Sequence, residues 1–209
     1  MRRAAINLLL CFLVLLSPSL AAAEQRLLLL GDSLIAGYGL PAKDGFAEQL
    51  QRALTARGYD VRVLDAGVSG DTSAGGLARL GWSLAEQPTH AIVELGANDA
   101  LRGLSPQAMQ QNLNAIVSQL QDAGVRVLLA GMRAPGNLGP EYREAFEGAY
   151  RQVAEKHGIA LYPFFLEGLP GKPELIQTDG LHPNADGVAT IVQNIMPAVE
   201  ALLAEGEPK

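Results

Sequence analysis

Short apolar runs alternate with longer amphipathic stretches along most of this chain. Runs bounded by glycine, aspartate or charged residues are typical of fully buried strands. They predict strands at residues 26–30, 61–65, 91–95, 125–130 and 160–162. The amphipathic stretches predict helices at residues 45–57, 77–86, 106–122, 141–156 and 186–203. Regular strand–helix alternation predicts a doubly wound, three-layer α/β/α sandwich with a parallel sheet between its helices.

The residues that flank two of the helical stretches support this assignment. Ser105 followed by Pro106 is a good helix start, with serine as the N-cap and proline at the first helical position. Gly158 after His157 is a good helix end. No internal repeat or linker-like stretch interrupts the alternation, so residues 24–209 are expected to form a single domain.

The first 23 residues have the pattern of a cleaved secretory signal peptide. A positive start is followed by nine unbroken apolar residues, 8–16, and then by the small residues 21–23. A membrane anchor fits less well, because a span needs about 20 apolar residues. Lipidation of Cys11 also fits less well, because that cysteine lies inside the apolar run rather than after it. The sequence therefore predicts export.

Composition narrows the function further. Cys11 is the only cysteine, so the mature chain has no thiolate metal site and no disulfide framework. Without residues 1–23 the chain carries 14 Lys and Arg against 22 Asp and Glu, a formal net charge of −8. An acidic chain with no basic run argues against nucleic acid and against electrostatic docking on anionic lipid. With no clustered histidines or cysteines, neither a metal nor another cofactor is expected.

The tetrapeptide Gly31-Asp32-Ser33-Leu34 directly follows the first predicted strand. A small-residue turn there would place the hydroxyl of Ser33 at the carboxyl end of a strand, where open α/β sheets bind ligands. By itself the tetrapeptide is equally consistent with a surface turn. A serine becomes a nucleophile only with a base to take its proton, an acid to orient that base and donors for an oxyanion.

Three further loops provide these groups. Gly70, after the second strand, can bring a backbone N–H close to a bound oxygen, and Asn98, after the third, can donate from its amide. Asp179 lies three residues before His182 in a turn-rich loop, where it could orient the imidazole. Each loop also has an ordinary explanation, as a helix N-cap, an Asn-Asp turn or an incidental histidine. All four together predict a serine hydrolase.

The four motifs resemble those of the SGNH, or GDSL, hydrolases. The matching residues are Gly31-Asp32-Ser33-Leu34, the glycine of Val68-Ser69-Gly70-Asp71, Gly96-Ala97-Asn98-Asp99, and Asp179 with His182. Along the mature chain the sequence looks like the periplasmic thioesterase I, arylesterase and lysophospholipase branch of Gram-negative bacteria. It departs from many members of that branch at Ala97, where they have glycine, and the methyl group could narrow the crevice.

The resemblance implies a five-stranded parallel sheet of flavodoxin-like order and a periplasmic location. It implies Ser33 as nucleophile, His182 as base and then acid, and Asp179 as the residue that orients His182. The oxyanion donors would be the backbone N–H groups of Ser33 and Gly70 and the amide of Asn98. The implied reaction is hydrolysis of esters, acyl thioesters or lysolipids through an acyl-enzyme.

The resemblance also places substrate contacts on loops after the third and fourth strands. Apolar residues of these loops could form the wall of a binding groove: Leu101, Leu104, Met132, Pro135, Leu138 and Tyr142. A small-molecule ester, thioester or lysolipid is the expected partner. No stable membrane insertion and no obligatory protein partner are expected, so the protein should act as a monomer.

Two other functions remain open at this stage. The same residues could remove acetyl groups from cell-envelope carbohydrate, although Trp82, the only tryptophan, falls in a helical pattern. A non-catalytic lipid- or acyl-binding protein is a third hypothesis, against which the complete set of catalytic groups argues. An α/β-hydrolase is disfavoured, because the residue two positions after Ser33 is not the expected glycine.

Overall fold

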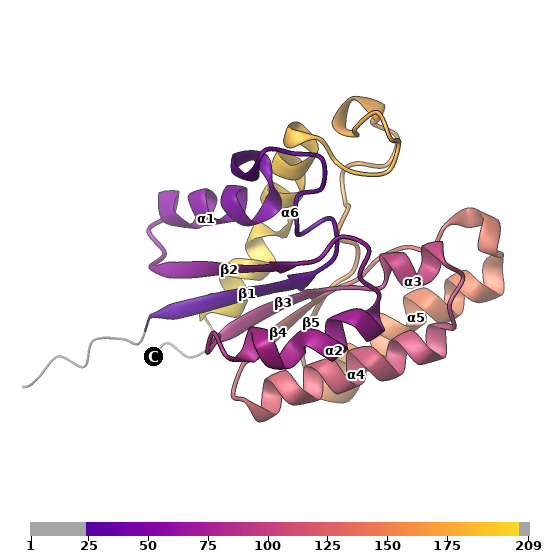
Figure 1. Ribbon diagram of the computed structural model, residues 1–209, viewed down its shortest axis with the longest axis horizontal. Coiled ribbons are helices and arrows are strands. Elements are labelled where there is room, and N and C mark those ends of the chain that lie inside the picture. Colours follow the sequence, from indigo (N-terminus) through magenta and orange to yellow (C-terminus); the bar gives the residue numbers. More distant parts are fainter. Residues whose placement is uncertain (1–23, 205–209) are drawn as a thin grey trace, which may run out of the picture.

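The structure, a computed structural model, describes residues 24–204, so the expected signal peptide at residues 1–23 lies outside the described residues. Five parallel strands form the sheet in the order β2-β1-β3-β4-β5 (Figure 1). They are β1 Gln25–Gly31, β2 Val61–Gly67, β3 His90–Glu94, β4 Arg126–Ala130 and β5 Ala160–Tyr162. The predicted doubly wound sandwich and its flavodoxin-like strand order are confirmed.

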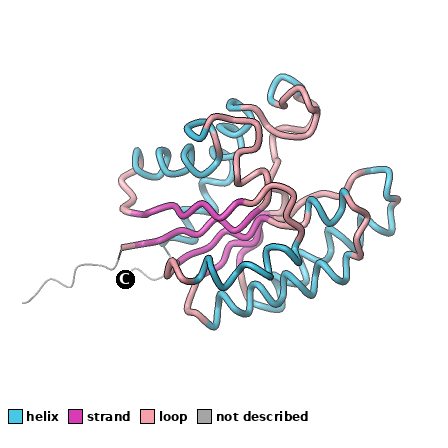
Figure 2. Tube along the Cα trace, in the orientation of Figure 1, coloured by secondary structure: helices cyan, strands magenta, loops and turns pink. Residues whose placement is uncertain are grey.

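Helices cover both faces of the sheet (Figure 1). Helices α1 (Phe46–Ala56) and α6 (Ala185–Ala204) pack together on one face. The other face carries α2 (Ser73–Leu84), α4 (Pro106–Asp122) and α5 (Pro140–His157). The short helix α3 (Ala97–Leu101) follows β3, and three 3₁₀ turns lie at Ala42–Asp44, Gly136–Leu138 and Pro173–Leu175. Many of the loops gather at the carboxyl ends of the strands (Figure 2).

Most of strand β1 is buried because the strand lies between β2 and β3 with helices on both faces. Its four leucines, residues 27–30, are at most 1% exposed. The aromatic side chains of Phe46 on α1 and Phe146 on α5 are fully buried on opposite faces. The continuous leucine run therefore reflects a strand buried on both sides, as the sequence predicted.

Two elements differ from the sequence prediction. Helix α2 starts at Ser73 rather than at residue 77, with the Thr72 hydroxyl accepting from the Gly75 N–H at 3.3 Å. The prediction missed the first turn because Gly76 stands at a buried position where an apolar side chain would have marked the helical pattern. A Cβ at Gly76 would clash with the side chain of Leu95, the residue after β3, so glycine helps α2 to pack closely there. Residues 97–101 were expected to lie in a loop, and they form the short helix α3.

Helix α6 is, among the described helices, the one long and apolar enough to cross a membrane by length and composition. Its apolar residues pack on α1, β4 and β5, and nine residues of the helix are buried. The apolar character of α6 is thus explained by its place in the core.

Shortening a side chain of β1 tests the importance of this core. Leu29→Ala should lower the free energy of unfolding by about 2–5 kcal/mol, because it leaves a cavity that the packed sheet cannot close. Trp82→Ala is the control, since that side chain is 83% exposed on α2 and its removal should cost under about 0.5 kcal/mol. Urea unfolding followed by circular dichroism measures both. Equal losses in the two variants would contradict this account.

Candidate active site

Ser33 lies on a tight helical turn at the carboxyl end of β1. The Asp32 carbonyl accepts from the Ala36 N–H at 3.0 Å, and the Ser33 carbonyl accepts from the Tyr38 N–H at 3.1 Å. Gly31 is required at the start of this turn, because a Cβ there would clash with Ile35 and lie 2.9 Å from the Glu94 carbonyl oxygen. The sequence thus folds so that Ser33 is half-buried at the crevice between β1 and β3.

The hydroxyl of Ser33 meets His182 across 149 residues of sequence. Ser33 Oγ lies 2.9 Å from His182 Nε2, and His182 Nδ1 lies 2.6 Å from Asp179 Oδ2. The His182 ring is also covered by Tyr38, with ring centroids 4.6 Å apart. The three residues that the sequence singled out are therefore within hydrogen-bond reach in the order that a nucleophile, base and orienting acid require.

Backbone contacts hold the loop that carries Asp179 and His182. The other carboxylate oxygen of Asp179, Oδ1, accepts from the backbone N–H groups of Leu181 and His182, at 2.9 and 3.0 Å. Gln177 donates its backbone N–H to the His182 carbonyl at 2.7 Å and its side-chain amide to the Tyr38 carbonyl at 2.8 Å. These contacts fix the imidazole relative to the turn of Ser33.

The environment of Asp179 favours its charged form. The Leu181 N–H, the His182 ring and the His182 N–H each donate to this carboxylate and together lower its pKa to about 2. Asp179 is therefore ionised at any pH at which the protein is expected to work. A negative charge beside Nδ1 favours the tautomer with its proton on that nitrogen, leaving Nε2 free to accept a proton.

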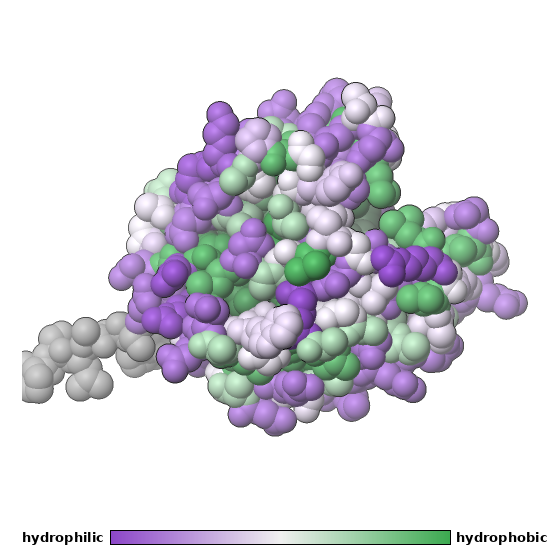
Figure 3. All heavy atoms as spheres, in the orientation of Figure 1, coloured by the Kyte–Doolittle hydropathy of each residue, from purple (hydrophilic) through white to green (hydrophobic). Residues whose placement is uncertain are grey.

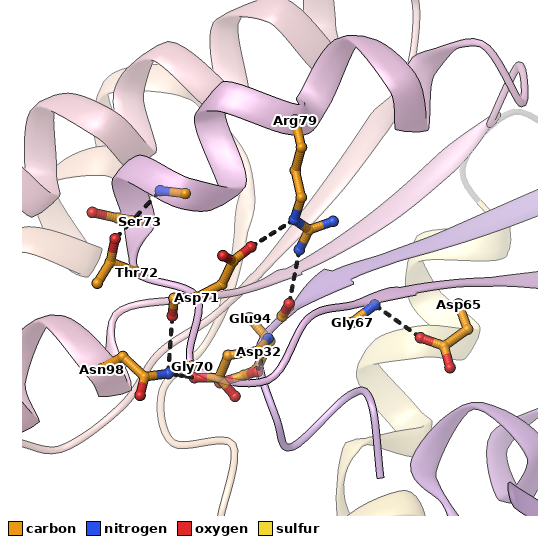
Figure 4. A network of polar contacts seen from close by, with 12 residues as sticks. Asp32, Asp65, Gly67, Gly70, Asp71, Thr72, Ser73, Arg79, Glu94 and Asn98 are labelled. Atoms are coloured by element: carbon orange, nitrogen blue, oxygen red, sulfur yellow. Dashed lines mark hydrogen bonds and ion pairs between the residues drawn. The ribbon is translucent and has the colours of Figure 1, made fainter. Parts of the chain in front are cut away.

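The proposed oxyanion donors gather beside Ser33. Gly70 has φ +83°, a conformation that favours glycine, and its carbonyl accepts from Arg102 Nη2 at 2.7 Å. Asn98 lies in the first turn of the short helix α3, and its Nδ2 donates to Asp32 Oδ2 and to the Asp71 carbonyl, both at 2.9 Å (Figure 4). The backbone N–H groups of Ser33 and Gly70 donate to no other residue in the described part of the chain.

A buried contact that the sequence analysis missed holds the Asn98 helix in place. Asp99 is 3% exposed and accepts from the N–H and the hydroxyl of Ser73, at 2.7 and 2.6 Å. Asn112 of α4 donates to the same hydroxyl at 2.9 Å. Asp99 thereby ties α3 to α2 and α4. The sequence analysis gave Asn98 a role as a donor but none to Asp99, whose partners lie far away in the sequence.

Two buried carboxyl groups, those of Asp32 and Glu94, lie beneath the nucleophile. Asp32 and Glu94 are each 1% exposed and hydrogen-bond to each other through their side chains. Burial raises the pKa of Asp32, although the Leu34 N–H opposes this by donating to its Oδ1 at 3.0 Å. Burial, and then the charge of Asp32, raise the pKa of Glu94 well above its usual range. Of the two carboxyl groups, Glu94 is therefore the one that more readily keeps its proton.

A cavity of about 280 Å³ opens over Ser33 and His182. Of the predicted contacts, Leu101, Met132 and Pro135 line it. Leu104, Leu138 and Tyr142 are not among the lining residues, because Tyr142 packs on Phe146 and donates its hydroxyl to the Leu104 carbonyl. Apolar residues gather beside a hollow near the carboxyl ends of the strands (Figure 3).

Several other lining residues were missed by the sequence analysis. Tyr38, Leu166 and Leu181 add apolar surface. Arg133 brings a positive charge, with its guanidinium 4.2 Å above the centroid of the Phe164 ring. These residues lie in loops without a periodic pattern, so nothing in the sequence marked them. Among residues 24–204, no group of three or more His, Cys, Asp or Glu could hold a metal ion.

Comparison with known proteins identifies the family. Residues 29–189 match the GDSL-like Lipase/Acylhydrolase family. The chain is 46% identical to Esterase TesA of Pseudomonas aeruginosa over 192 residues, 91% of this chain and 94% of that protein. It is 43% identical over 176 residues to Thioesterase 1/protease 1/lysophospholipase L1 of Escherichia coli K12, 84% of this chain and 83% of that protein. It therefore belongs to the GDSL-like lipase/acylhydrolase family.

The fold agrees with this assignment. A crystal structure of TesA matches with a TM-score of 0.82 at 45% sequence identity, over 85% of this chain and 99% of that one. The expected kinship with the SGNH hydrolases is thus confirmed in sequence and in structure.

The low pKa of Asp179 can be measured directly. Its side-chain carboxyl carbon should titrate near pH 2 by NMR, rather than near the usual value of about 4. Because the folded-state pKa is lowered, the contribution of Asp179 to stability should be complete above about pH 4 and lost as pH falls towards 2. His182→Ala should restore only part of the normal pKa, since both backbone N–H donors remain. Titration of the unmodified protein near pH 4 would contradict this.

Proposed function

We propose that this protein hydrolyses carboxylic esters and acyl thioesters, with Ser33 as the nucleophile. The observation that carries the proposal is the continuous contact from Ser33 Oγ to His182 Nε2, at 2.9 Å, and from His182 Nδ1 to Asp179, at 2.6 Å. Support also comes from two relatives that bear the names esterase and thioesterase 1/lysophospholipase L1. The apolar lining of the cavity suits an acyl chain.

The chemistry follows from the positions of these groups. Ser33 Oγ attacks the carbonyl carbon of the substrate while its proton passes to His182 Nε2. The resulting oxyanion is stabilised by the N–H groups of Ser33 and Gly70 and by the Asn98 amide. As the carbon–oxygen or carbon–sulfur bond breaks, the imidazolium returns the proton to the leaving alcohol or thiol. Water then attacks the acyl-enzyme with His182 again as base, which releases the acid and restores Ser33.

The cellular setting is proposed on the N-terminal pattern. Residues 1–23 have the charge, apolar run and small-residue end of a signal peptide, which supports export to the periplasm. Residues 24–209 would then act as one domain, as a monomer and without stable membrane insertion. Lysolipids could be substrates there, because the cavity beside Ser33 is lined by apolar side chains.

Removing the nucleophile tests the mechanism. Ser33→Ala should lower kcat on an aryl ester by at least about 10³-fold, because no other group at the site can form the acyl-enzyme. Ser118→Ala is the control, since that serine lies on α4 away from the cavity.

A serine-directed phosphonate should add to the unmodified protein and to Ser118→Ala, and mass spectrometry should locate the adduct at Ser33. Normal turnover by Ser33→Ala, or labelling elsewhere with activity retained, would overturn the mechanism. Absence of labelling and of turnover in the unmodified protein would instead favour a non-catalytic acyl-binding role.

Substrate preference distinguishes an acyl esterase from a carbohydrate acetylesterase. Medium-chain aryl esters and acyl thioesters should give a higher kcat/KM than an acetylated sugar, because apolar residues form most of the cavity wall and Trp82 lies outside it. Rates measured across a series of acyl chain lengths test this. Faster deacetylation of the sugar would favour the carbohydrate function while leaving the role of Ser33 intact.

A further inference from the structure

The side chain of Asp32 is buried at the nucleophile but takes no part in the mechanism above. It is 1% exposed, and its two oxygens have different partners (Figure 4). Oδ1 accepts from the Leu34 N–H at 3.0 Å, which shapes the turn that carries Ser33. Oδ2 accepts from Asn98 Nδ2 at 2.9 Å. One carboxylate thus contacts both the nucleophile turn and an oxyanion donor.

The Asn98 amide is fully occupied before any substrate binds. Its nitrogen carries two hydrogens, and its two acceptors, Asp32 Oδ2 and the Asp71 carbonyl oxygen, both lie at 2.9 Å (Figure 4). An oxyanion can therefore receive a hydrogen bond from this amide only by taking or sharing one of these two hydrogens.

The two acceptors are unequal competitors. Asp32 offers a carboxylate in a buried setting, and hydrogen bonds to an ionised acceptor are about twice as strong as neutral ones. The Asp71 carbonyl is neutral, and it belongs to a loop whose Asp71 side chain is already held by Arg79, with Oδ2 and Nε 2.6 Å apart. The hydrogen bond to the Asp71 carbonyl is thus the weaker of the two and the easier to exchange.

Glu94 supplies the proton that makes this arrangement possible. It lies at the end of β3, beside Gly31 in the register of β1 and β3, and is hydrogen-bonded to the Asp32 side chain. Its own Oε2 receives only a long hydrogen bond, 3.4 Å, from the Asp32 N–H. Asp32 accepts two shorter hydrogen bonds, from the Leu34 N–H and from Asn98 Nδ2. The negative charge of the pair is therefore better stabilised on Asp32, and the proton on Glu94. Burial raises the pKa of both carboxyl groups, and the charge of Asp32 raises that of Glu94 further.

We propose that Asp32 is a positioning residue for the oxyanion hole: its carboxylate retains one N–H of Asn98, so that the N–H bonded to the Asp71 carbonyl turns to the developing oxyanion. Glu94 keeps Asp32 ionised and oriented by donating its carboxyl proton. This inference rests on the proposed hydrolase function, since it concerns how an oxyanion donor is aimed.

An asparagine cannot replace Asp32 in this role. The position must accept from the Leu34 N–H with one oxygen and from Asn98 Nδ2 with the other. The amide of asparagine offers a single oxygen, so one of the two donors would face an NH₂ group. Asp32→Asn has almost the same size and therefore tests the second acceptor rather than packing.

The test is a double-mutant cycle between Asp32 and Asn98 on an aryl ester. Asn98→Ala should lower kcat by about 10²–10³-fold, the usual effect of losing one oxyanion donor. Asp32→Asn should lower kcat by at least about tenfold, with KM changed by less than about twofold, because the lost interaction belongs to the transition state. In the Asn98→Ala background, Asp32→Asn should cost less than about twofold more.

Asp65→Asn is the matched control. Asp65 also accepts a backbone N–H two residues on, from Gly67 at 2.9 Å, but lies on the neighbouring strand β2 and does not contact Asn98. Its substitution should leave kcat unchanged. Thermal unfolding of each variant verifies that the comparison is made on folded protein.

Substitutions at Glu94 give a second test should Asp32→Asn fail to fold. Glu94→Gln keeps one donor for the Asp32 carboxylate and one acceptor for its N–H, and should retain most of the kcat that Glu94→Leu loses. Equal activity of Glu94→Leu and the unmodified protein would overturn the proposal.

The proposal would also be overturned if Asp32→Asn lowered kcat by the same factor in the unmodified protein and in Asn98→Ala. These failures differ from failure of the hydrolase function, because turnover by the unmodified protein would still depend on Ser33.

Discussion

The parallel pairing of β1 with β3 is the constraint on which the rest of the site depends. This register sets Gly31 opposite Glu94, so the turn after β1 and the helix after β3 begin side by side. Strand order reverses at this point of the sheet, and the two loops diverge to opposite faces and leave a crevice between them. Ser33 and Asn98 lie close together there because the pairing of β1 with β3 fixes where the two following segments begin.

The same pairing brings two carboxyl groups into the protein interior. An isolated charge at that depth would be expensive, and a pair that shares one proton reduces the cost by keeping a single charge within reach of several N–H donors. Two other carboxylates near the crevice are also paired with donors, Asp99 with Ser73 and Asp71 with Arg79. Polar groups tie the loops together where apolar packing ends, and the leucines of β1 provide the rigid base.

Much of this arrangement was predictable from the sequence, and the failures have physical causes. Buried strands leave continuous apolar runs, and the groups of a serine hydrolase fall in recognisable loops, so the fold and the Ser33–His182–Asp179 contact were anticipated. The first turn of α2 was missed because Gly76 hides the helical period. The partnership of Asp32 with Glu94 was missed because it depends on strand register. The direction of the Tyr142 side chain, which points to Phe146 rather than into the cavity, was not predictable because its partner lies elsewhere in the folded chain.

The acid and the base of this site lie three residues apart on one loop, held by hydrogen bonds within that loop. The two residues therefore form one local unit. If the loop moves, Asp179 and His182 move together, and the imidazole keeps its orientation relative to the carboxylate. Only the distance to Ser33 changes with such a movement. A protein built in this way can vary the loops around its cavity, and with them the molecules it accepts, without having to reassemble its proton-transfer machinery.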